Sequence, residues 1–388
     1  MRSPGHHTAP RSLSPHSKSS VRVKIGLIIY GTLDTLSGGY LYDRQLVAHL
    51  RANGCEVEIL SLPWRNYPSH LSDNLRLNWA RQIADTNYDL LLQDELNHPS
   101  LFLLNRLLRR QCTCPLITIV HHLRSSEDHP AALLPFYRAV ERQYLTTIDG
   151  CIFNSQTTKQ TVHQLLGDSV PHVVAYPAAD HLQPPTHGSV ISAITERLQR
   201  RAPLQLLFVG NLMARKRLHT VLHALAHLNQ PNWQLHIVGS QAVDPGYSSD
   251  MHQLANRLAL SSRLTWHGRI SNEELVKLYL TSDSLVMPSY EGFGIVYLEA
   301  MAHGLPVIAT TAGAAREIVQ PGKNGYLIPL DDDMRLAQYL ERIQTNRVHL
   351  ATLAFHARQS FEAHPTWQES MHAAFQWLCE FTKRAYIE

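Results

Sequence analysis

The sequence predicts an α/β protein with parallel sheets in two domains, and three observations support this fold class. Short apolar runs alternate with glycine-containing loops and helical stretches, as in residues 284–309, and such strand–loop–helix–strand units build parallel sheets. The chain has 388 residues, which is too long for one ordinary core and suits two domains. Its 44% hydrophobic and 17% charged residues are typical of a globular protein.

Charge and hydropathy exclude several classes of protein. The net charge is only +3, from 35 basic and 32 acidic residues, so we expect no nucleic-acid partner. The apolar runs are shorter than the roughly 20 residues that a membrane-spanning helix needs. Residues 1–20 are rich in Ser, Pro and His and lack an apolar core segment, which predicts a disordered tail rather than a secretory signal. We therefore expect a cytoplasmic protein.

Cysteine and histidine usage predicts no metal site. The chain has five cysteines, an odd number that does not indicate a disulfide framework. Cys112 and Cys114 form a Cys-x-Cys pair, but no second cysteine pair or nearby histidine cluster completes a zinc site. His121 and His122 also lack a partner at helical spacing. We predict neither a structural metal nor a cofactor.

The first half opens with a glycine-containing loop that is either a phosphate-binding loop or an ordinary turn. Residues 23–30 predict a buried strand and residues 31–39 a loop that ends in Gly38 and Gly39, ahead of a helix over 41–53. Backbone N–H groups in such a loop can hold phosphate. The loop lacks the G-x-G-x-x-G pattern of dinucleotide-binding proteins, which argues against an oxidoreductase. Further strands are predicted at 57–60, 88–93, 116–120, 150–154 and 172–175, with a helix at 155–166.

A proline-containing linker over residues 176–188 leads to a second set of strands. The loop 211–217 after the first of these strands carries Arg215, Lys216 and Arg217 and opens a helix. Cationic groups at such a position can neutralise a departing diphosphate. The predicted elements are strands at 204–209, 234–238, 284–288 and 305–309, and helices at 218–228 and 367–386.

The run 289–307 is the most informative segment because it joins two carboxylates and a glycine turn at a predicted helix start. With a helix from about Gly294, Glu299 lies roughly one and a half turns inside it while Glu291 stays in the loop. Carboxylates accept hydrogen bonds from sugar hydroxyls, and Gly292 lets the backbone approach a ligand. Ligands of open α/β sheets bind at the carboxyl ends of strands. The run therefore indicates a nucleotide-sugar site.

The run from Pro288 to Val307 resembles the Glu-x7-Glu signature of the retaining glycosyltransferases related to glycogen synthase (glycosyltransferase family 4, "glycosyl transferases group 1"). The resemblance continues through residues 317–319 and 322–328. It implies the GT-B fold, in which two Rossmann-like domains face each other across a cleft. The implied division is an acceptor domain at 21–185, a donor domain at 186–365 and a C-terminal helix at 366–388 that packs back on the first domain.

The resemblance also implies roles for individual residues. Lys216 matches the family's lysine, whereas Asn211 occupies the position of the family's arginine, so Arg215 would supply the missing charge. Arg217 stands where the family often has glycine. The implied catalytic residues are Glu291 and His121, and the implied donor-binding residues are Gly38, Gly39, Arg215, Lys216, Gly292, Phe293, Gly294, Ile295 and Glu299.

The function implied by the resemblance is transfer of a hexosyl-type group (EC 2.4) from a nucleoside-diphosphate sugar with retention and without metal. A saccharide, a lipid and a small metabolite all stay open as the acceptor. Two alternatives remain: a non-catalytic nucleotide-sugar-binding subunit, because Asn211 breaks one charge position, and a GT-B epimerase. Residues 101–110 place arginines among leucines; a core-facing helix is favoured over peripheral docking at the inner face of the membrane.

Overall fold

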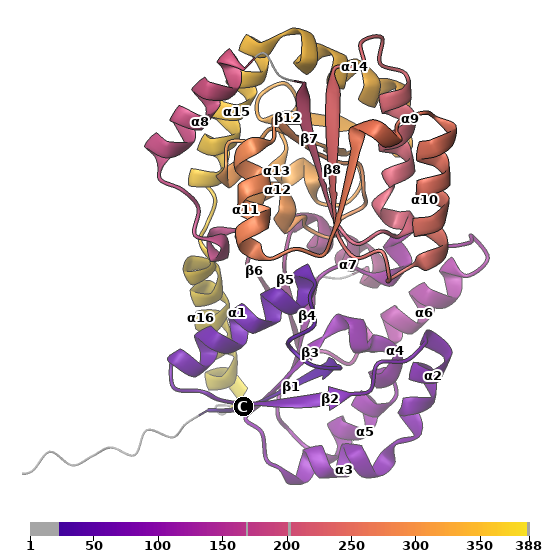
Figure 1. Cartoon of the computed structure of the whole chain (residues 1–388). Helices are drawn as coiled ribbons and strands as arrows, with labels where there is room; N and C mark the ends of the chain where they lie inside the picture. The colour runs from indigo at the N-terminus through magenta and orange to yellow at the C-terminus, as the bar shows by residue number, and fades with distance from the viewer. Residues whose placement is uncertain (1–22, 168–169, 201–202, 386–388) are drawn as a thin grey trace, which may run out of the picture.

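The structure of the protein is a computed structural model that describes residues 23–167, 170–200 and 203–385. The predicted tail at 1–20 lies outside the described residues. Two α/β halves stack on each other, with the N-terminal half below and the C-terminal half above in Figure 1. Each half carries a six-stranded parallel sheet, which confirms the predicted fold class.

The N-terminal sheet has the order β2-β1-β3-β4-β5-β6. Its central strands are mostly apolar and are buried along nearly their whole length, as expected of a parallel sheet covered by helices on both faces. The strands are β1 (Lys24–Tyr30), β2 (Glu56–Leu62), β3 (Leu90–Asp94), β4 (Leu116–Val120), β5 (Gly150–Phe153) and β6 (His172–Val174). The main helices are α1 (Gly38–Ala52), α2 (Tyr67–Ser72), α3 (Leu77–Asp85), α4 (His98–Leu101), α5 (Leu104–Gln111), α6 (Leu134–Leu145) and α7 (Gln156–Leu166).

The start of α1 differs from the expected boundary. The helix begins at Gly38 rather than Leu41, because the Ser37 side chain accepts a hydrogen bond from the Tyr40 backbone N–H (3.3 Å) and caps it. Gly38 and Gly39 therefore belong to the first helical turn. They still lie at the carboxyl end of β1.

The amphipathic stretch 101–110 turns its leucines inward. Leu101, Leu104 and Leu108 are fully buried in the apolar cluster beneath the sheet, and Arg109 forms an ion pair with Asp149 (2.6 Å). This packing agrees with the favoured interpretation as a core-facing helix. Within the described residues, no helix combines the length and the apolarity that crossing a membrane requires.

The C-terminal sheet has the order β12-β11-β10-β7-β8-β9. Its strands are β7 (Leu204–Val209), β8 (Trp233–Val238), β9 (Leu264–Gly268), β10 (Ser284–Met287), β11 (Val307–Thr310) and β12 (Gly325–Ile328). The helices are α8 (His187–Gln199), α9 (Leu218–Ala226), α10 (Pro245–Arg257), α11 (Asn272–Thr281), α12 (Ile295–Ala302), α13 (Ala315–Ile318), α14 (Asp333–Thr345) and α15 (Arg347–Glu362).

Strand β12 was not among the predicted strands. It is only four residues long and follows a turn, so its apolar pattern is too short to identify. Gly325 pairs with Val307 of β11, and a Cβ at Gly325 would lie 2.0 Å from the Val307 carbonyl oxygen. Only glycine therefore fits at this register.

Helix α16 (Trp367–Ala385) returns to the N-terminal half, where it lies beside α1 (Figure 1). Its buried residues Trp367, Met371, Ala374 and Leu378 join the same apolar cluster as β1 and α1. A Cβ at Gly150 of β5 would lie 2.7 Å from the Trp377 ring, so the helix touches the sheet. The last segment of the chain thus ties the two halves together.

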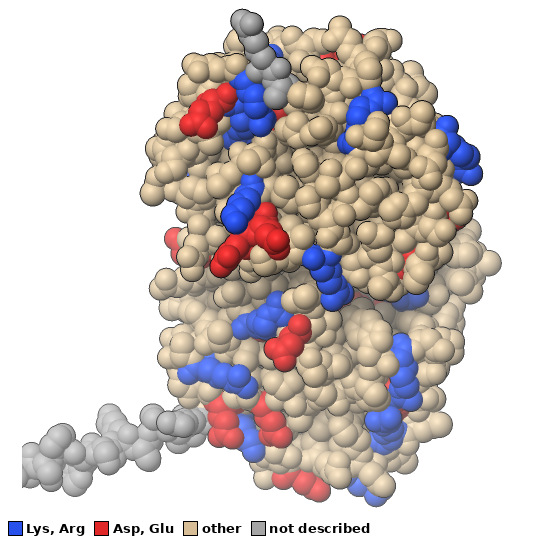
Figure 2. Space-filling view, viewed as in Figure 1, with Lys and Arg blue, Asp and Glu red and all other residues tan. Residues whose placement is uncertain are grey.

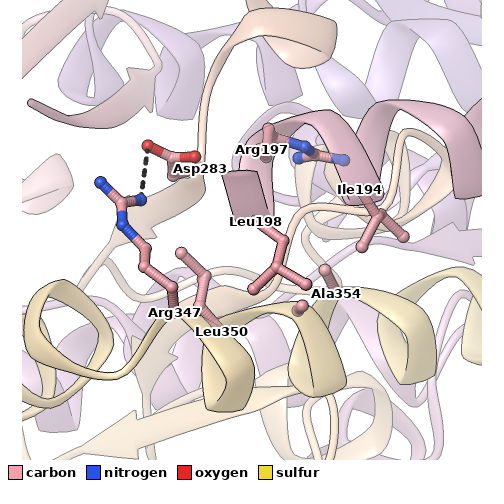
Figure 3. Close-up of a pocket in the computed structure, with 8 residues that line it drawn as sticks. Ile194, Arg197, Leu198, Asp283, Arg347, Leu350 and Ala354 are labelled. Atoms are coloured by element: carbon pink, nitrogen blue, oxygen red, sulfur yellow. Dashed lines mark ion pairs between the residues drawn. The ribbon is translucent and has the colours of Figure 1, made fainter. Parts of the chain in front are cut away.

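Charges on the face in Figure 2 are of both signs and scattered, without a large field of one sign. This distribution agrees with the small net charge. A charged cluster of a different kind lies inside the C-terminal half, at the amino end of β10. Asp283 is fully buried there and bridges Arg200 (2.6 Å) and Arg347 (3.3 Å; Figure 3). The adjoining cavity of about 10 Å³ holds one water at most.

We expect Asp283→Asn to lower the free energy of unfolding by about 2 kcal/mol, because it leaves two partly buried guanidinium groups facing each other without their carboxylate. Asp250→Asn, at an exposed position of α10, is the matched control and should change stability by less than about 0.5 kcal/mol. Urea unfolding followed by circular dichroism measures both. Equal stabilities would show that the bridge contributes nothing.

Candidate functional site

The candidate site begins where two neighbouring strands of the C-terminal sheet end. Strands β7 and β10 are paired in parallel, so their carboxyl ends lie at one edge and the loops after them are adjacent. These loops carry Lys216 and Glu291, which are 75 residues apart in the sequence. Gly294, with φ of 96°, turns the second loop into α12, a conformation that glycine adopts without strain.

Lys216 and Glu291 form a nearly buried ion pair. Lys216 Nζ donates to Glu291 Oε1, and Ser289 Oγ donates to the same oxygen (2.7 Å). Both charged side chains are only 13% exposed. Burial lowers the pKa of Lys216. Burial alone would raise the pKa of Glu291, but Lys216 and Arg215 outweigh it and hold that pKa below its usual value. The site therefore holds a lysine cation and a carboxylate that are largely shielded from water.

Glu299 lies on α12, about one helical turn after the first residue of that helix. Its Oε2 accepts a hydrogen bond from the Tyr279 hydroxyl (2.8 Å), and its Oε1 lies 3.3 Å from His181 Nε2. His181 belongs to the segment that links the halves. Both oxygens of Glu299 thus have protein partners, and each keeps a further lone pair that can accept from a ligand.

His121 directly follows β4 in the N-terminal half. Its Nε2 lies 3.3 Å from Oδ1 of Asp43, a fully buried residue of α1. Burial lowers the pKa of His121, but Asp43 and Asp94 outweigh it and raise that pKa to about 9. At neutral pH the side chain is therefore an imidazolium, which donates hydrogen bonds and does not accept a proton.

Glycines bring the two halves into contact at this point. A Cβ at Gly292 would lie 2.3 Å from the His121 carbonyl oxygen, and one at Gly39 would lie 3.2 Å from the His121 ring. A Cβ at Gly38 would lie 3.5 Å from Ile295 Cδ1. The predicted residues of the first loop, the β4 end and the α12 start thus converge, although they come from both domains.

Phe293 and Ile295 contribute packing rather than polar side chains. The Phe293 ring is buried and lies 6.0 Å from Tyr176 and 5.8 Å from His364, between centroids. Ile295 packs against the apolar clusters of both halves. What these residues can offer a ligand is the backbone N–H groups at the start of α12, where the first turn has no intrahelical acceptors.

The residues of the basic loop 211–217 make different contacts. Asn211 accepts a hydrogen bond from the Ser240 backbone N–H (3.1 Å) and so braces the neighbouring loop. Arg217 has φ of 55°, in the left-handed region that glycine adopts most easily, and its guanidinium joins Asp331 to Asp128 (3.0 Å) of the other half. Arg215 lies close enough to lower the pKa of both Glu291 and Glu127.

Sequence analysis missed the groups that hold the predicted residues in place. Asp43 and Asp94 position His121, and Ser289 positions Glu291. Glu317 of α13 accepts from the backbone N–H groups of Gln156 (3.0 Å) and Thr157 (2.6 Å) at the start of α7, which fixes one half on the other. Of these residues, only Asp94 could have been identified from the sequence, because it is a polar residue at the end of a predicted strand. The other contacts join segments that are far apart in the sequence.

Two groups of side chains within the described residues have the spacing of metal ligands. Asp43, Asp94 and His121 form the first, and Glu95, His98 and Glu141 the second. His121 already directs a nitrogen to Asp43 in the first group. The prediction that the chain binds no metal stays a prediction.

Comparison with known proteins places this geometry in a family. Residues 194–360 match the family model "Glycosyl transferases group 1", and residues 40–178 match "Glycosyl transferase 4-like domain". The D-inositol 3-phosphate glycosyltransferase of Corynebacterium aurimucosum is 29% identical over 290 residues, 69% of this chain and 68% of the relative. The protein of that name from Xylanimonas cellulosilytica is 26% identical over 252 residues, 63% of this chain, and the chain spans only 60% of the relative's length.

Solved structures share the fold. Sucrose-phosphate synthase from Thermosynechococcus elongatus superimposes with a TM-score of 0.80 at 22% identity, covering 94% of this chain and 100% of that chain. Anabaena Alr3699/HepE in complex with UDP and glucose gives 0.72 at 21% identity, covering 92% and 100%. With the two family matches, this agreement shows that the chain belongs to the group 1 glycosyl transferases and has the GT-B fold.

Proposed function

We propose that the protein is a glycosyltransferase that moves a sugar from a nucleoside-diphosphate donor to an acceptor with retention of configuration and without a metal ion at the diphosphate. The observation that carries the proposal is the nearly buried Lys216–Glu291 pair, whose loop meets the His121 backbone through Gly292 at the junction of the two halves. Complexes of Anabaena HepE with UDP and with UDP-glucose support the donor class.

The cations of the loop 211–217 take the place of a metal ion in this proposal. A leaving nucleoside diphosphate carries negative charge that must be neutralised as the glycosidic bond breaks. Lys216 and Arg215 lie beside Glu291 and can shift from this carboxylate to the diphosphate. Glu291 is then available to accept hydrogen bonds from sugar hydroxyls, and Glu299 from the ribose.

His121 acts as a hydrogen-bond donor rather than as a base in the proposed reaction, because its raised pKa keeps it protonated. The acceptor oxygen forms a bond to the anomeric carbon on the face that the diphosphate leaves. The acceptor proton passes to the departing diphosphate oxygen. The positive charge of His121 stabilises the negative charge that develops there.

Two other functions remain as alternatives. Asn211 stands at the family's arginine position and is committed to Ser240, so a donor-binding subunit without turnover is the first. An epimerase, which would interconvert nucleotide sugars without any acceptor, is the second. Incubation of the protein with a radiolabelled donor separates them: transfer requires an acceptor, epimerisation does not, and a binding subunit yields neither.

Lys216→Ala should lower kcat by about 10²-fold or more, because it removes the cation that neutralises the leaving group. Lys277→Ala, at an exposed position of α11, removes the same charge elsewhere and should leave kcat unchanged. Initial rates with saturating donor measure the effect, and circular dichroism verifies folding. A wild-type rate for Lys216→Ala would contradict the assignment.

Activity should fall as the pH rises through about 9, since His121 loses its proton there. The folded pKa lies above the unfolded value of about 6.5, so the ion pair stabilises the fold fully below that value and no longer does so above about 9. Asp43→Asn removes the main partner and should move the alkaline limb of the kcat profile to lower pH. If the alkaline limb of the Asp43→Asn profile stays at the same pH, a group other than His121 titrates there.

Glu299→Gln should weaken nucleotide binding about tenfold, equivalent to roughly 1.4 kcal/mol, with a smaller effect on kcat. Glu273→Gln, at an exposed position of α11, is the control. Calorimetry with UDP, GDP and ADP and with EDTA present measures affinity and identifies the donor nucleotide. Unchanged affinity would assign Glu299 to the contact with Tyr279 and His181 alone.

A further inference from the structure

A second cluster of ionisable groups lies inside the N-terminal half. Glu95 and His98 follow β3, in the turn that leads into α4, and Glu141 lies on α6. Their exposed fractions are 3%, 2% and 0%. Each offers one ligand atom, and these atoms lie within 4.8 Å of one another. The cluster uses neither Lys216 nor Glu291 and is not part of the proposed donor site.

Two carboxylate oxygens in this cluster lack a hydrogen-bond partner. Glu141 Oε1 accepts from the Ser125 backbone N–H (3.0 Å), whereas Glu141 Oε2 is buried without any hydrogen bond among the described residues. Glu95 Oε1 is buried as well, and the polar atom in contact with it is His98 Nδ1 (3.0 Å). Buried carboxylate oxygens are normally paired or bound to a metal. Burial raises the pKa of Glu95 to about 8 and also raises that of Glu141, which favours their protonated forms. A cation that displaces these protons would supply the missing partner of the oxygens.

His98 presents a nitrogen to the same point. Its Nδ1 lies 3.0 Å from Glu95 Oε1 and 3.1 Å from the Glu95 backbone carbonyl oxygen, while its Nε2 lies 3.1 Å from the Tyr67 hydroxyl oxygen. Burial lowers the pKa of His98 to about 4, so the ring is neutral. In the ring without a metal, Nδ1–H donates to the Glu95 backbone carbonyl. Binding of an ion would use the other tautomer, in which Nε2–H is donated to Tyr67 and the Nδ1 lone pair lies beside Glu95 Oε1. A metal-bound histidine commonly donates its other N–H to an oxygen in this way.

Arg124 is the nearby protein cation, and it does not fill this role. Its guanidinium lies over the rings of Tyr67 (4.8 Å) and Tyr137 (4.9 Å from each centroid). Among the residues that the structure describes, no ion pair joins Arg124 to Glu95 or Glu141. Arg124 therefore does not neutralise the two carboxyl groups by direct contact.

We propose that Glu95, His98 and Glu141 bind a divalent transition-metal ion, with Zn²⁺ as the best match. One imidazole nitrogen and two carboxylate oxygens are a typical zinc ligand set. The ion joins the segment after β3 to α6, and Glu141 also holds Ser125 in the loop that follows His121. Its role is to hold the acceptor-side loops in place, and the diphosphate is neutralised without it.

The metal content of the resting protein tests this proposal without any substrate, so its failure is distinguishable from failure of the proposed function. Protein produced with added zinc is dialysed against a chelator, which strips ions from exposed histidines, and is analysed by mass spectrometry. We expect about one zinc per chain in the wild type and in the control Glu58→Gln, and almost none in Glu141→Gln. A folded wild type without zinc, or equal zinc in Glu141→Gln, overturns the proposal.

Cobalt substitution keeps the proposal testable if Glu141→Gln does not fold. Wild-type protein produced with Co²⁺ in place of zinc should show visible absorption bands from an ion bound by nitrogen and oxygen ligands. Absence of these bands in folded protein overturns the proposal, and the two carboxylates would then share a proton.

Discussion

The contact between Gly292 and the His121 carbonyl is the constraint on which the site depends. Because a Cβ at Gly292 would come within 2.3 Å of that oxygen, only a glycine lets the loop after β10 meet the end of β4. The carboxylate of Glu317, bound to the start of α7, and the return of α16 to the N-terminal half keep this approach in place. Residues from two separate cores thereby form one site.

The two halves contribute different charged groups to the protein. In the C-terminal half, a lysine and a carboxylate are held nearly dry beside a second cation, an arrangement that can exchange its internal ion pair for a charged ligand. In the N-terminal half, buried acids surround the histidines. Asp43 keeps His121 charged, whereas burial keeps His98 neutral. The charged ring of His121 can only donate hydrogen bonds, whereas the neutral ring of His98 has one nitrogen that can accept.

Much of the fold was predictable because parallel sheets have strong local signals. The strands 116–120 and 204–209 have the predicted bounds, since each is an apolar run that ends at a loop. The boundaries that shifted, such as the start of α1, depend on a single cap. The edge strand β12 has four residues and no periodic pattern that distinguishes it from a turn.

The sequence by itself determined the α/β fold class, most of the strands, the two carboxylates eight residues apart and the basic loop before a helix. Only the tertiary structure decided which charges meet. The Lys216–Glu291 pair joins residues 75 apart, Asp43 meets His121 across 78 residues, and Glu141 reaches Glu95 from another helix. Local propensities act over one element, whereas burial and Coulomb interactions depend on distances that exist only after the sheets and helices have packed.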